Sequence, residues 1–407
     1  MLQSQMKITL FNTLSGKEEE IIPINEGKIS IYACGPTVYD IPHIGNARSN
    51  VFYDLLFRIF RAMYEEVTYV RNITDVDDKI IARSKVENTT CEELSTRITR
   101  AFHEDLSALN CLEPTYEPKA TQYISQIVAL IQELHANGFA YKVETEFGGE
   151  WLFSVGKYQE YGKLSNKKLE DLIAGARIEV KEHKHAPEDF VLWKNVKEDE
   201  YGFQTELGFG RPGWHIECSA MSTTLLGENF DIHGGGIDLQ FPHHENEIAQ
   251  SVCAKKGSTF AKYWVHNGFL KVNGEKMSKS LGNFLTVRDA FKNCNPLALR
   301  LCLLSTHYRK PLDFNTHSLE TAKLNIAKFE KALAEFELLI EKKQNVKIDE
   351  IPQNAKEALM ANVNISKYLA IMHAMPKDIK NTVTDLEHKK ILAQQFWNMG
   401  ALIGIFI

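Results

Sequence analysis

Two segments far apart in the chain carry residue types suited to phosphate chemistry. Lys276 and Lys279 are separated by two residues in the loop KMSKS, which has Gly274 before it and Gly282 after it. Two such cations can close over a triphosphate, while the segment PHIGN at residues 42–46 can open a helix whose first amide groups face phosphate. Each segment alone is weak evidence, because a Lys-Ser loop is usually a solvated turn. Together they predict ATP-driven activation of a carboxylate.

A third segment is rich in side chains that can bind metal. Between Gly234 and Glu247 a glycine-rich strand end leads into an expected helix that carries His243 four residues before Glu247. Residues at this spacing project from one face of a helix, as two ligands of one metal must. On its own such a segment more often lines a solvated helix. Cys34 and Cys218 would complete a set of two thiolates, one imidazole and one carboxylate that suits zinc.

The glycines in this segment point to a bound nucleotide. A triple glycine is otherwise only a turn, but glycine lets the flat face of a ligand approach the backbone. Asp238 follows the glycines and can accept hydrogen bonds from ribose hydroxyls, as strand-end acids do in dinucleotide-binding folds. We therefore expect Gly235 and Asp238 in an ATP site.

The composition sets broad limits. With 407 residues, 44% hydrophobic and 25% charged, the chain has the make-up of a folded protein of roughly two to four domains. No signal-peptide core and no membrane-length apolar run is present, so we expect a cytoplasmic protein that does not engage membranes. Seven scattered cysteines indicate reduced thiols. The net charge of -6 argues against indiscriminate nucleic-acid binding but allows a local basic surface.

The elements that must position these residues alternate between strand and helix. A β-prone run at residues 27–32, an apolar helical pattern at 51–60 and a second β-prone run at 66–70 predict a βαβ unit with a parallel sheet. Ligands of such sheets bind at the carboxyl ends of the strands, where Cys34 and Thr74 fall. We predict an α/β, Rossmann-like catalytic domain.

This rhythm is interrupted once and then abandoned. From about Pro114 to Lys194 short mixed strands predict an inserted α+β domain, and the βαβ pattern resumes near Pro212. After Thr306 apolar residues recur at three- and four-residue steps, which predicts an all-α helical bundle.

These motifs, taken in order, resemble the cysteinyl-tRNA synthetase family of class I aminoacyl-tRNA synthetases, from residue 6 to about residue 340. The resemblance rests on residues 34–40 (CGPTVYD), the His43 turn, residues 72–79, 189–194 (DFVLWK), 214–221 (WHIECSAM), 234–250 and 276–283. It implies five regions: residues 1–115 as the first half of the catalytic domain, 116–205 as the inserted connective domain, 206–265 as the second half, 266–315 as a stem-contact region with the lysine loop, and 316–407 as a helical bundle contacting tRNA.

The resemblance also implies roles for individual residues. The zinc ligands would be Cys34, Cys218, His243 and Glu247, with one Zn2+ per chain binding the thiolate of the substrate cysteine. Zinc lowers the pKa of a thiol and prefers sulfur to a hydroxyl, so the metal would separate cysteine from serine. Thr74, Trp214 and His233 would surround the amino acid. Without the resemblance, a Trp such as Trp214 is more often part of a hydrophobic core, and a strand His such as His233 more often only makes a structural hydrogen bond.

The implied reaction has two steps and the partners L-cysteine, ATP and tRNA(Cys). The cysteine carboxylate would attack the α-phosphate of ATP, which arrives with Mg2+, to give cysteinyl-adenylate and pyrophosphate. His43, Gly45, Asn46, Lys276 and Lys279 would meet the phosphate charge as preorganised donors. The cysteinyl group would then pass to a 2′-hydroxyl of the terminal adenosine of tRNA(Cys). We expect a monomer.

The chain departs from the family pattern in three places. Asn46 replaces the second His of the His-x-Gly-His motif, but its amide can still donate to phosphate. Residues 362–365 (NVNI) replace an acidic stretch, and the chain stops at Ile407, about where a small anticodon-reading domain begins in the family. The stop at Ile407 has three possible explanations: a natural short synthetase, a truncation, or a paralogue with another acceptor.

Two alternatives to tRNA charging follow from these departures. One is a ligase that joins cysteine to an amino sugar, as in mycothiol synthesis. The other is a non-catalytic, zinc-bearing module that binds tRNA. The run Pro36 to Asp40 and the segment Trp193-Lys194 favour the tRNA enzymes, and the intact lysine loop argues against a non-catalytic module.

Overall fold

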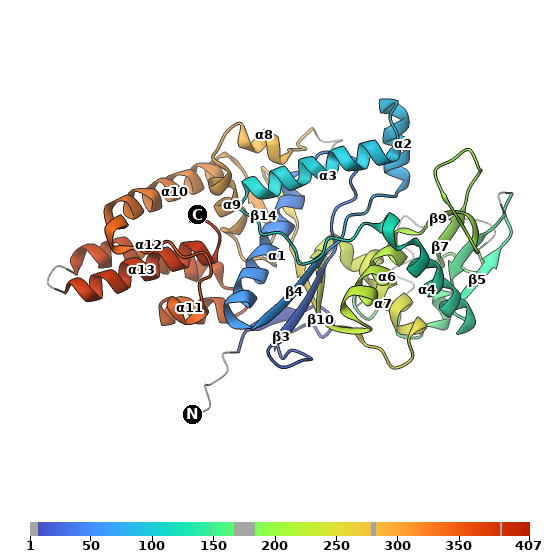
Figure 1. Cartoon of the computed structure of the whole chain (residues 1–407), viewed down its shortest axis with the longest axis horizontal. Helices are drawn as coiled ribbons and strands as arrows, with labels where there is room; N and C mark the ends of the chain where they lie inside the picture. The colour runs from blue at the N-terminus through green and yellow to red at the C-terminus, as the bar shows by residue number, and fades with distance from the viewer. Residues whose placement is uncertain (1–6, 147, 167–183, 278–281, 383–384) are drawn as a thin grey trace.

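The computed structural model describes residues 7–146, 148–166, 184–277, 282–382 and 385–407. Figure 1 shows an elongated molecule with a parallel sheet at its centre, an antiparallel sheet at one end and a group of helices at the other. No helix in the described part of the chain combines the length and apolar character needed to span a bilayer.

The central sheet has four parallel strands in the order β11-β10-β3-β4. These are β3 (Lys28–Ala33), β4 (Glu66–Arg71), β10 (Asn229–Gly236) and β11 (Phe260–Asn267). The connection from β3 to β4 runs through helix α1 (Ile44–Met63), as the sequence predicted. Ile31, Ile232 and Val265 on these strands are fully buried, which explains why parallel strands read as apolar runs. The first half of the domain also contains β1 (Thr9–Asn12), β2 (Lys17–Glu20), α2 (Asp78–Glu87) and α3 (Cys91–Ala108).

The predicted insertion forms a separate antiparallel sheet of five strands in the order β5-β6-β7-β9-β8. Its elements are α4 (Ile124–Ala136), β5 (Ala140–Val143), β6 (Glu150–Phe153), β7 (Phe190–Asn195), β8 (Phe203–Thr205) and β9 (Gly208–Pro212). Helices α6 (Trp214–Leu226) and α7 (Glu245–Ala254) return the chain to the central sheet and share an apolar core with α4 through Ile131, Ile216 and Ala249. The sheet runs on to Pro212, past residue 205, and the domain boundaries given above stay predictions.

The rest of the chain is mainly helical. A small sheet consists of β12 (Leu270–Val272), β13 (Glu275–Lys276) and β14 (Leu312–Phe314). Helices α8 (Val287–Phe291) and α9 (Pro296–Leu304) lie between β13 and β14 in the sequence. The bundle comprises α10 (Thr316–Phe336), α11 (Gln353–Met360), α12 (Ile365–Asn381) and α13 (Leu386–Leu402). The fold class predicted from the sequence, a split parallel-sheet domain with an inserted domain and a terminal helical bundle, is confirmed (Figure 1).

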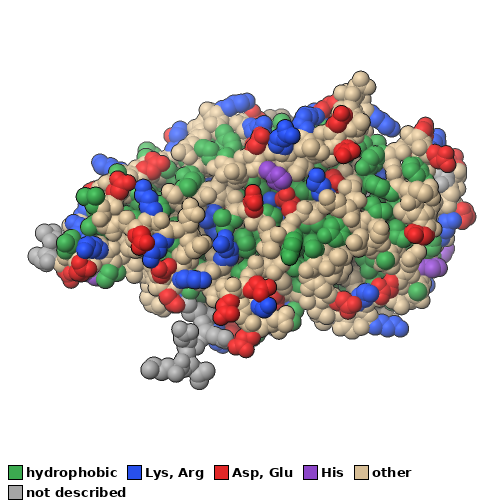
Figure 2. Space-filling model, in the orientation of Figure 1, with side chains coloured by type: hydrophobic (Ala, Val, Ile, Leu, Met, Phe, Trp, Pro, Cys, Tyr) green, Lys and Arg blue, Asp and Glu red, His purple; other side chains and the backbone are tan. Residues whose placement is uncertain are grey.

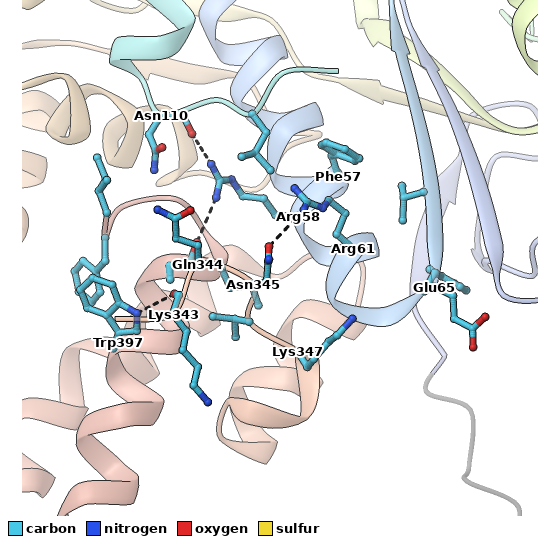
Figure 3. A pocket seen from close by; sticks show the side chains of 18 residues that line it. Phe57, Arg58, Arg61, Glu65, Asn110, Lys343, Gln344, Asn345, Lys347 and Trp397 are labelled. Atoms are coloured by element: carbon cyan, nitrogen blue, oxygen red, sulfur yellow. Dashed lines mark hydrogen bonds between the residues drawn. The ribbon is translucent and has the colours of Figure 1, made fainter. Parts of the chain in front are cut away.

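A large cavity of 770 Å³ separates the end of α1 from the bundle (Figure 3). Several polar groups around it are already bonded within the protein: Arg58 donates to the Asn110 carbonyl, and Trp397 Nε1 donates to the Lys343 carbonyl at 3.1 Å. Of the residues predicted for catalysis, the three that the structure describes, His43, Asn46 and Lys276, do not line this cavity. On the face shown in Figure 2, basic and acidic side chains are interspersed, so this face has no single dominant charge.

Candidate active site and metal centre

A second cavity, of 510 Å³, opens at the carboxyl ends of the central strands. It brings together seven residues that the sequence singled out for binding or chemistry: Cys34, His43, Gly45, Asn46, Trp214, Asp238 and Lys276. They come from the ends of β3 and β10, the starts of α1 and α6, and the strand β13 before the lysine loop. The smaller cavity is therefore the candidate active site.

The start of α1 shows how the sequence builds a phosphate-facing helix end. His43 is the N-cap residue: its Nδ1 accepts from the Asn46 amide at 3.1 Å, and Asn46 Oδ1 accepts from the His43 amide at 3.1 Å. This reciprocal cap uses the side-chain oxygen of Asn46 as an acceptor and turns its NH2 group, the only donor of that side chain, into the group available to a phosphate. A Cβ atom on Gly45 would lie 2.9 Å from the His43 ring, which explains the glycine.

The two signature segments are neighbours in the fold. Residue 43 pairs with Thr286 across an antiparallel bridge, and the Ile44 amide donates to the Leu285 carbonyl at 3.1 Å. The Phe284 ring meets the His43 ring edge-on at 5.3 Å between centroids. Lys276 lines the same cavity, whereas Lys279 lies outside the described residues. The chain thus brings the flanks of the lysine loop against the start of α1.

Beside this cavity the structure assembles the predicted metal group. One ligand atom from each of Cys34, Cys218, His243 and Glu247 lies within 4.8 Å of every other. The Cys34 and Cys218 sulfurs are 3.8 Å apart, and His243 Nε2 lies 3.0 Å from Glu247 Oε1. Four donors of these types at these separations match a tetrahedral zinc site.

A second set of four shares two of these residues. Cys34 and Glu247 also lie within the same distance of His233 and His244. Glu247 Oε2 is 2.8 Å from His233 Nε2, and His244 Nε2 is 3.3 Å from the Cys34 sulfur. Only the first set contains a second thiol, and thiolate is the donor that most favours zinc. The first set is therefore the better metal site, with His233 and His244 placed to hold its members.

His243 does not lie on a regular α-helix, as the sequence interpretation assumed. The chain leaves β10 through a short turn at Ile237–Leu239, Phe241 has an extended conformation, and α7 begins only at Glu245. The residues before α7 form a wider turn, and the spacing of four still brings His243 Nε2 to the Glu247 carboxylate. The expected juxtaposition is correct, but its local geometry differs.

The neighbours of His243 fix its ring. Trp214 stacks on it with 4.3 Å between centroids, and His215 Nδ1 lies 3.0 Å from His243 Nδ1. Burial lowers the pKa of His215 to about 3, so His215 is neutral and its Nδ1 can accept a hydrogen bond from the protonated Nδ1 of His243. This arrangement directs His243 Nε2 toward Glu247 as the nitrogen available to a metal, which is how supporting groups orient metal-binding histidines.

Burial disfavours the charged form of every group in this site. Burial raises the pKa of the Cys34 thiol and of the Glu247 carboxyl well above their usual ranges, and burial lowers the pKa of His243. Among the described residues, no Lys or Arg pairs with Glu247; its ion-pair partners are histidines. Two thiols and a carboxylate buried without a cation suit a bound dication.

The residues expected around the amino acid occupy different depths. Trp214 lines the cavity and is 39% exposed, whereas Thr74 and His233 are buried beside the metal group. His233 stacks on Trp264 with 4.5 Å between centroids. Thr74 follows β4, and its backbone carbonyl accepts from the Val38 amide at 3.1 Å. All three positions are compatible with a small amino-acid pocket next to the metal.

Of the two residues expected in the ATP site at the glycine-rich strand end, the structure places one in the cavity. Asp238 lines the cavity as expected, but Gly236 rather than Gly235 accompanies it. A Cβ atom on Gly235 would lie 2.8 Å from Leu239 Cδ1 and 3.2 Å from the His244 ring. Gly235 is therefore required by packing beneath the cavity.

The sequence interpretation missed two histidines that contact the metal group, His215 and His244. His215 lies three residues before Cys218 in the segment WHIECSAM, and His244 follows His243 in the segment FPHHENE, so a histidine close to an expected ligand was the available signal. The contacts themselves could not be predicted, because His244 meets Cys34, 210 residues away in the sequence, only through tertiary packing. Lys79, which lines the cavity near Tyr39, was likewise not singled out.

Comparisons with known proteins agree with this geometry. Residues 20–324 match the family model described as the tRNA synthetases class I (C) catalytic domain. A cysteine–tRNA ligase of Wolbachia pipientis from Culex pipiens is 50% identical over 403 residues, which cover 98% of this chain and 84% of the relative. The cysteine–tRNA ligase of Rhodospirillum rubrum is 47% identical, with 98% and 85% covered.

Solved structures of related enzymes share the fold. A Mycobacterium tuberculosis methionyl-tRNA synthetase in complex with methionyl-adenylate superposes with a TM-score of 0.62 at 13% identity, covering 93% of this chain and 90% of that one. A LeuRS from Agrobacterium radiobacter, in a ternary complex with tRNA and LeuAMS, gives 0.64 at 10% identity, with 95% and 84% covered. With a family match over most of its length and relatives about half identical to it, the chain belongs to the cysteine–tRNA ligase family of class I tRNA synthetases.

Proposed function

We propose that this protein activates L-cysteine with ATP and transfers the cysteinyl group to tRNA(Cys). The observation that carries the proposal is the juxtaposition at one cavity of a phosphate-facing helix end and a zinc-type donor set. The relatives described above bear the name cysteine–tRNA ligase along nearly the whole of this chain, which favours a tRNA acceptor over an amino sugar or a non-catalytic role.

Cys34, Cys218, His243 and Glu247 would hold one Zn2+. When bound, zinc would favour the thiolate form of the substrate cysteine and discriminate against the hydroxyl of serine. The chain's own part is to present these donors together: His215 holds the ring of His243, and His233 holds the second oxygen of Glu247. Such support fixes each donor before the substrate arrives.

The activation step needs positioning and charge more than covalent chemistry. An oxygen of the cysteine carboxylate forms a bond to the α-phosphorus of ATP, and the bond from that phosphorus to the bridging oxygen breaks, so that pyrophosphate leaves with Mg2+. The amide of Gly45 at the start of α1, the NH2 group of Asn46, and Lys276 with Lys279 would meet the charge on the phosphates. Asp238 would accept from the ribose hydroxyls.

Substrate placement follows from the two ends of the cavity. Cys34, a member of the metal-binding tetrad Cys34, Cys218, His243 and Glu247, lines the cavity together with His43 and Asn46. A cysteine bound between them would have its thiol toward the tetrad and its carboxylate toward His43 and Asn46. Thr74, Trp214 and His233 would enclose the amino acid next to the metal. For the second step no protein nucleophile is needed, because the tRNA 2′-hydroxyl attacks the activated carbonyl and AMP leaves.

The proposal is tested with the purified full chain in two assays. Cysteine-dependent exchange of labelled pyrophosphate into ATP reports activation, and labelled cysteine on tRNA(Cys) reports transfer. We expect both, with serine at least about a hundredfold poorer in exchange than cysteine, since metal selection must replace pocket contacts that barely separate near-isosteres. Exchange without transfer would overturn the tRNA acceptor, and absence of both would overturn the whole proposal.

A further inference from the structure

Arg48 is a buried cation that the functions proposed above do not use. It lies on the second turn of α1 and is 3% exposed. The other buried arginines of the described chain each pair with a carboxylate: Arg71 with Glu117, Arg211 with Asp78 and Arg300 with Asp54. No carboxylate among the described residues pairs with Arg48, and burial lowers its pKa to about 10. Burying a charge without a counter-ion is unfavourable, so the contacts that Arg48 makes instead indicate its role.

Arg48 joins α1 to two other segments through backbone carbonyl groups. Its Nη1 donates to the Phe269 carbonyl at 2.6 Å. Its Nη2 donates to the Lys310 carbonyl and, at 3.4 Å, to the Tyr308 carbonyl. Phe269 directly precedes β12, and Lys310 lies shortly before β14, the parallel neighbour of β12. One planar guanidinium, with donors on separate nitrogens, therefore holds the starts of both strands against α1.

The segment that Arg48 holds is also closely packed. The Gly268 amide donates to the Tyr308 carbonyl at 2.8 Å. A Cβ atom on Gly268 would lie 2.7 Å from the Arg309 carbonyl oxygen and 2.8 Å from the Lys310 carbonyl oxygen. The start of β12 is therefore fixed relative to α1 by close packing as well as by hydrogen bonds.

The strand that begins at this point leads to the lysine loop. β12 pairs with β13 in an antiparallel hairpin, in which Lys271 lies opposite Lys276. Lys271 comes only two residues after Phe269, and Lys276 lines the active-site cavity. A displacement at the start of β12 would therefore be passed across the hairpin to Lys276.

Helix α1 thus holds the lysine loop on both flanks. The segment after the loop bonds to Ile44 through the Leu285 carbonyl, and the hairpin before the loop is held by Arg48. The same helix begins at the expected phosphate site, where a misplacement of about 1 Å can cost on the order of a hundredfold in rate. We propose that Arg48 is a positioning residue, which acts through the β12–β13 hairpin to hold Lys276 in register with the start of α1. The inference rests on the proposed function, because Lys276 would meet the phosphate charge there.

The test is a double-mutant cycle between Arg48 and Lys276, measured by cysteine-dependent pyrophosphate exchange with the full chain. Arg48→Met removes the donors and keeps an apolar stem. We expect kcat to fall about tenfold to a hundredfold. The KM for cysteine should stay within about twofold, because the donors of the metal group come from other elements. In the Lys276→Ala background the same substitution should cost less than about threefold, because the group that Arg48 positions is gone.

The matched control is Arg300→Met, which removes another buried arginine, one that contacts neither β12 nor β14 in the described hydrogen bonds. Each kcat is expressed per folded chain, with the folded fraction taken from urea unfolding of the same preparation. Arg300→Met should change stability and leave kcat per folded chain within about twofold in both backgrounds. A purely structural role for Arg48 would give this same pattern.

The outcomes separate the inference from the proposed function. An unchanged kcat in Arg48→Met, or an equal loss in the wild-type and Lys276→Ala backgrounds, would overturn the positioning role. Absence of exchange in the wild-type chain would overturn the proposed function itself. If Arg48→Met does not fold, Arg48→Lys takes its place, since it keeps the charge but has one nitrogen for the three carbonyls. Its loss should be smaller, in the same direction, and again reduced in the Lys276→Ala background.

Discussion

The protein buries two clusters of charged side chains, and they are built in opposite ways. In the first, Arg300 of α9 and Arg58 of α1 pair with Asp54, and Arg300 Nε also donates to the Ile403 carbonyl at 2.8 Å. The remaining oxygen of Asp54 accepts from the Leu112 amide at 2.7 Å. In the second, the tetrad around Glu247, thiols and a carboxylate lie together with imidazoles that burial keeps neutral.

The difference separates a structural cluster from a functional one. The Arg300 cluster contains both signs of charge and joins α1, α9 and the segment after α13, so it is complete within the chain. The tetrad lacks a positive charge of its own, which a metal ion would supply. A buried polar group with missing partners therefore indicates a ligand, whereas one with every partner present indicates architecture.

The largest expected effect comes from removing a thiol of the tetrad. We expect Cys218→Ser to lose most of the bound zinc and to lower kcat/KM for cysteine by more than about a hundredfold, since loss of a supporting group alone costs 10–100-fold. Metal analysis and pyrophosphate exchange measure the two effects. Cys302→Ser, a buried cysteine on α9, is the control and should retain zinc. Full zinc content in Cys218→Ser would remove this residue from the ligand set.

Breaking the Arg300 cluster should affect stability instead. Arg300→Met leaves Asp54 buried with only Arg58 as partner, so we expect the free energy of unfolding to fall by about 3–5 kcal/mol. Urea unfolding followed by circular dichroism measures the change, and the folded fraction should keep its zinc. The double variant Asp54→Asn, Arg300→Met should recover part of the loss. A decrease below about 1 kcal/mol would contradict the structural role.

The support of the tetrad should matter less than its members. His215→Phe removes the partner of His243 Nδ1, so we expect zinc affinity to fall about tenfold to a hundredfold while the site still forms. Competition with a chromophoric chelator measures the affinity. His135→Phe, whose Nδ1 faces the Ala140 carbonyl in the inserted domain, serves as the control. Identical affinities in the wild type and His215→Phe would show that the ring of His243 is held by other contacts.

The smallest expected effect is on the pH dependence of stability, which tests the structural role of the Arg300 cluster. Burial raises the pKa of Asp54, but Arg300 and Arg58 outweigh it, so the pKa lies below its ordinary 3.8 in the folded protein. Its contribution is therefore complete above pH 3.8 and is lost as the pH falls through the lowered value. We expect the free energy of unfolding to fall more steeply in this acidic range for the wild type than for Asp54→Asn. Parallel curves would show that Asp54 does not titrate with folding.

The sequence predicted the parts of the fold that depend on local pattern. The βαβ unit, the insertion and the bundle follow from the local sequence pattern, and the start of a helix at the His43 turn was expected, whereas the cap that His43 and Asn46 form there was not. The tetrad was found because family motifs name its members, although Cys34 and Glu247 meet only through the pairing of β3 with β10. The Arg300 cluster escaped prediction, since it joins residues 54, 300 and 403 by tertiary packing and no local pattern marks them.

The most direct test of the account is to remove the metal and measure what is lost. The full chain is treated with a chelator, and cysteine-dependent pyrophosphate exchange is compared before and after stoichiometric zinc is returned. We predict that exchange is lost with the metal and recovers with one zinc per chain, together with the preference for cysteine over serine. A metal-free protein that activates cysteine with unchanged kcat/KM and unchanged preference would contradict the assignment of the tetrad as the selector of the substrate.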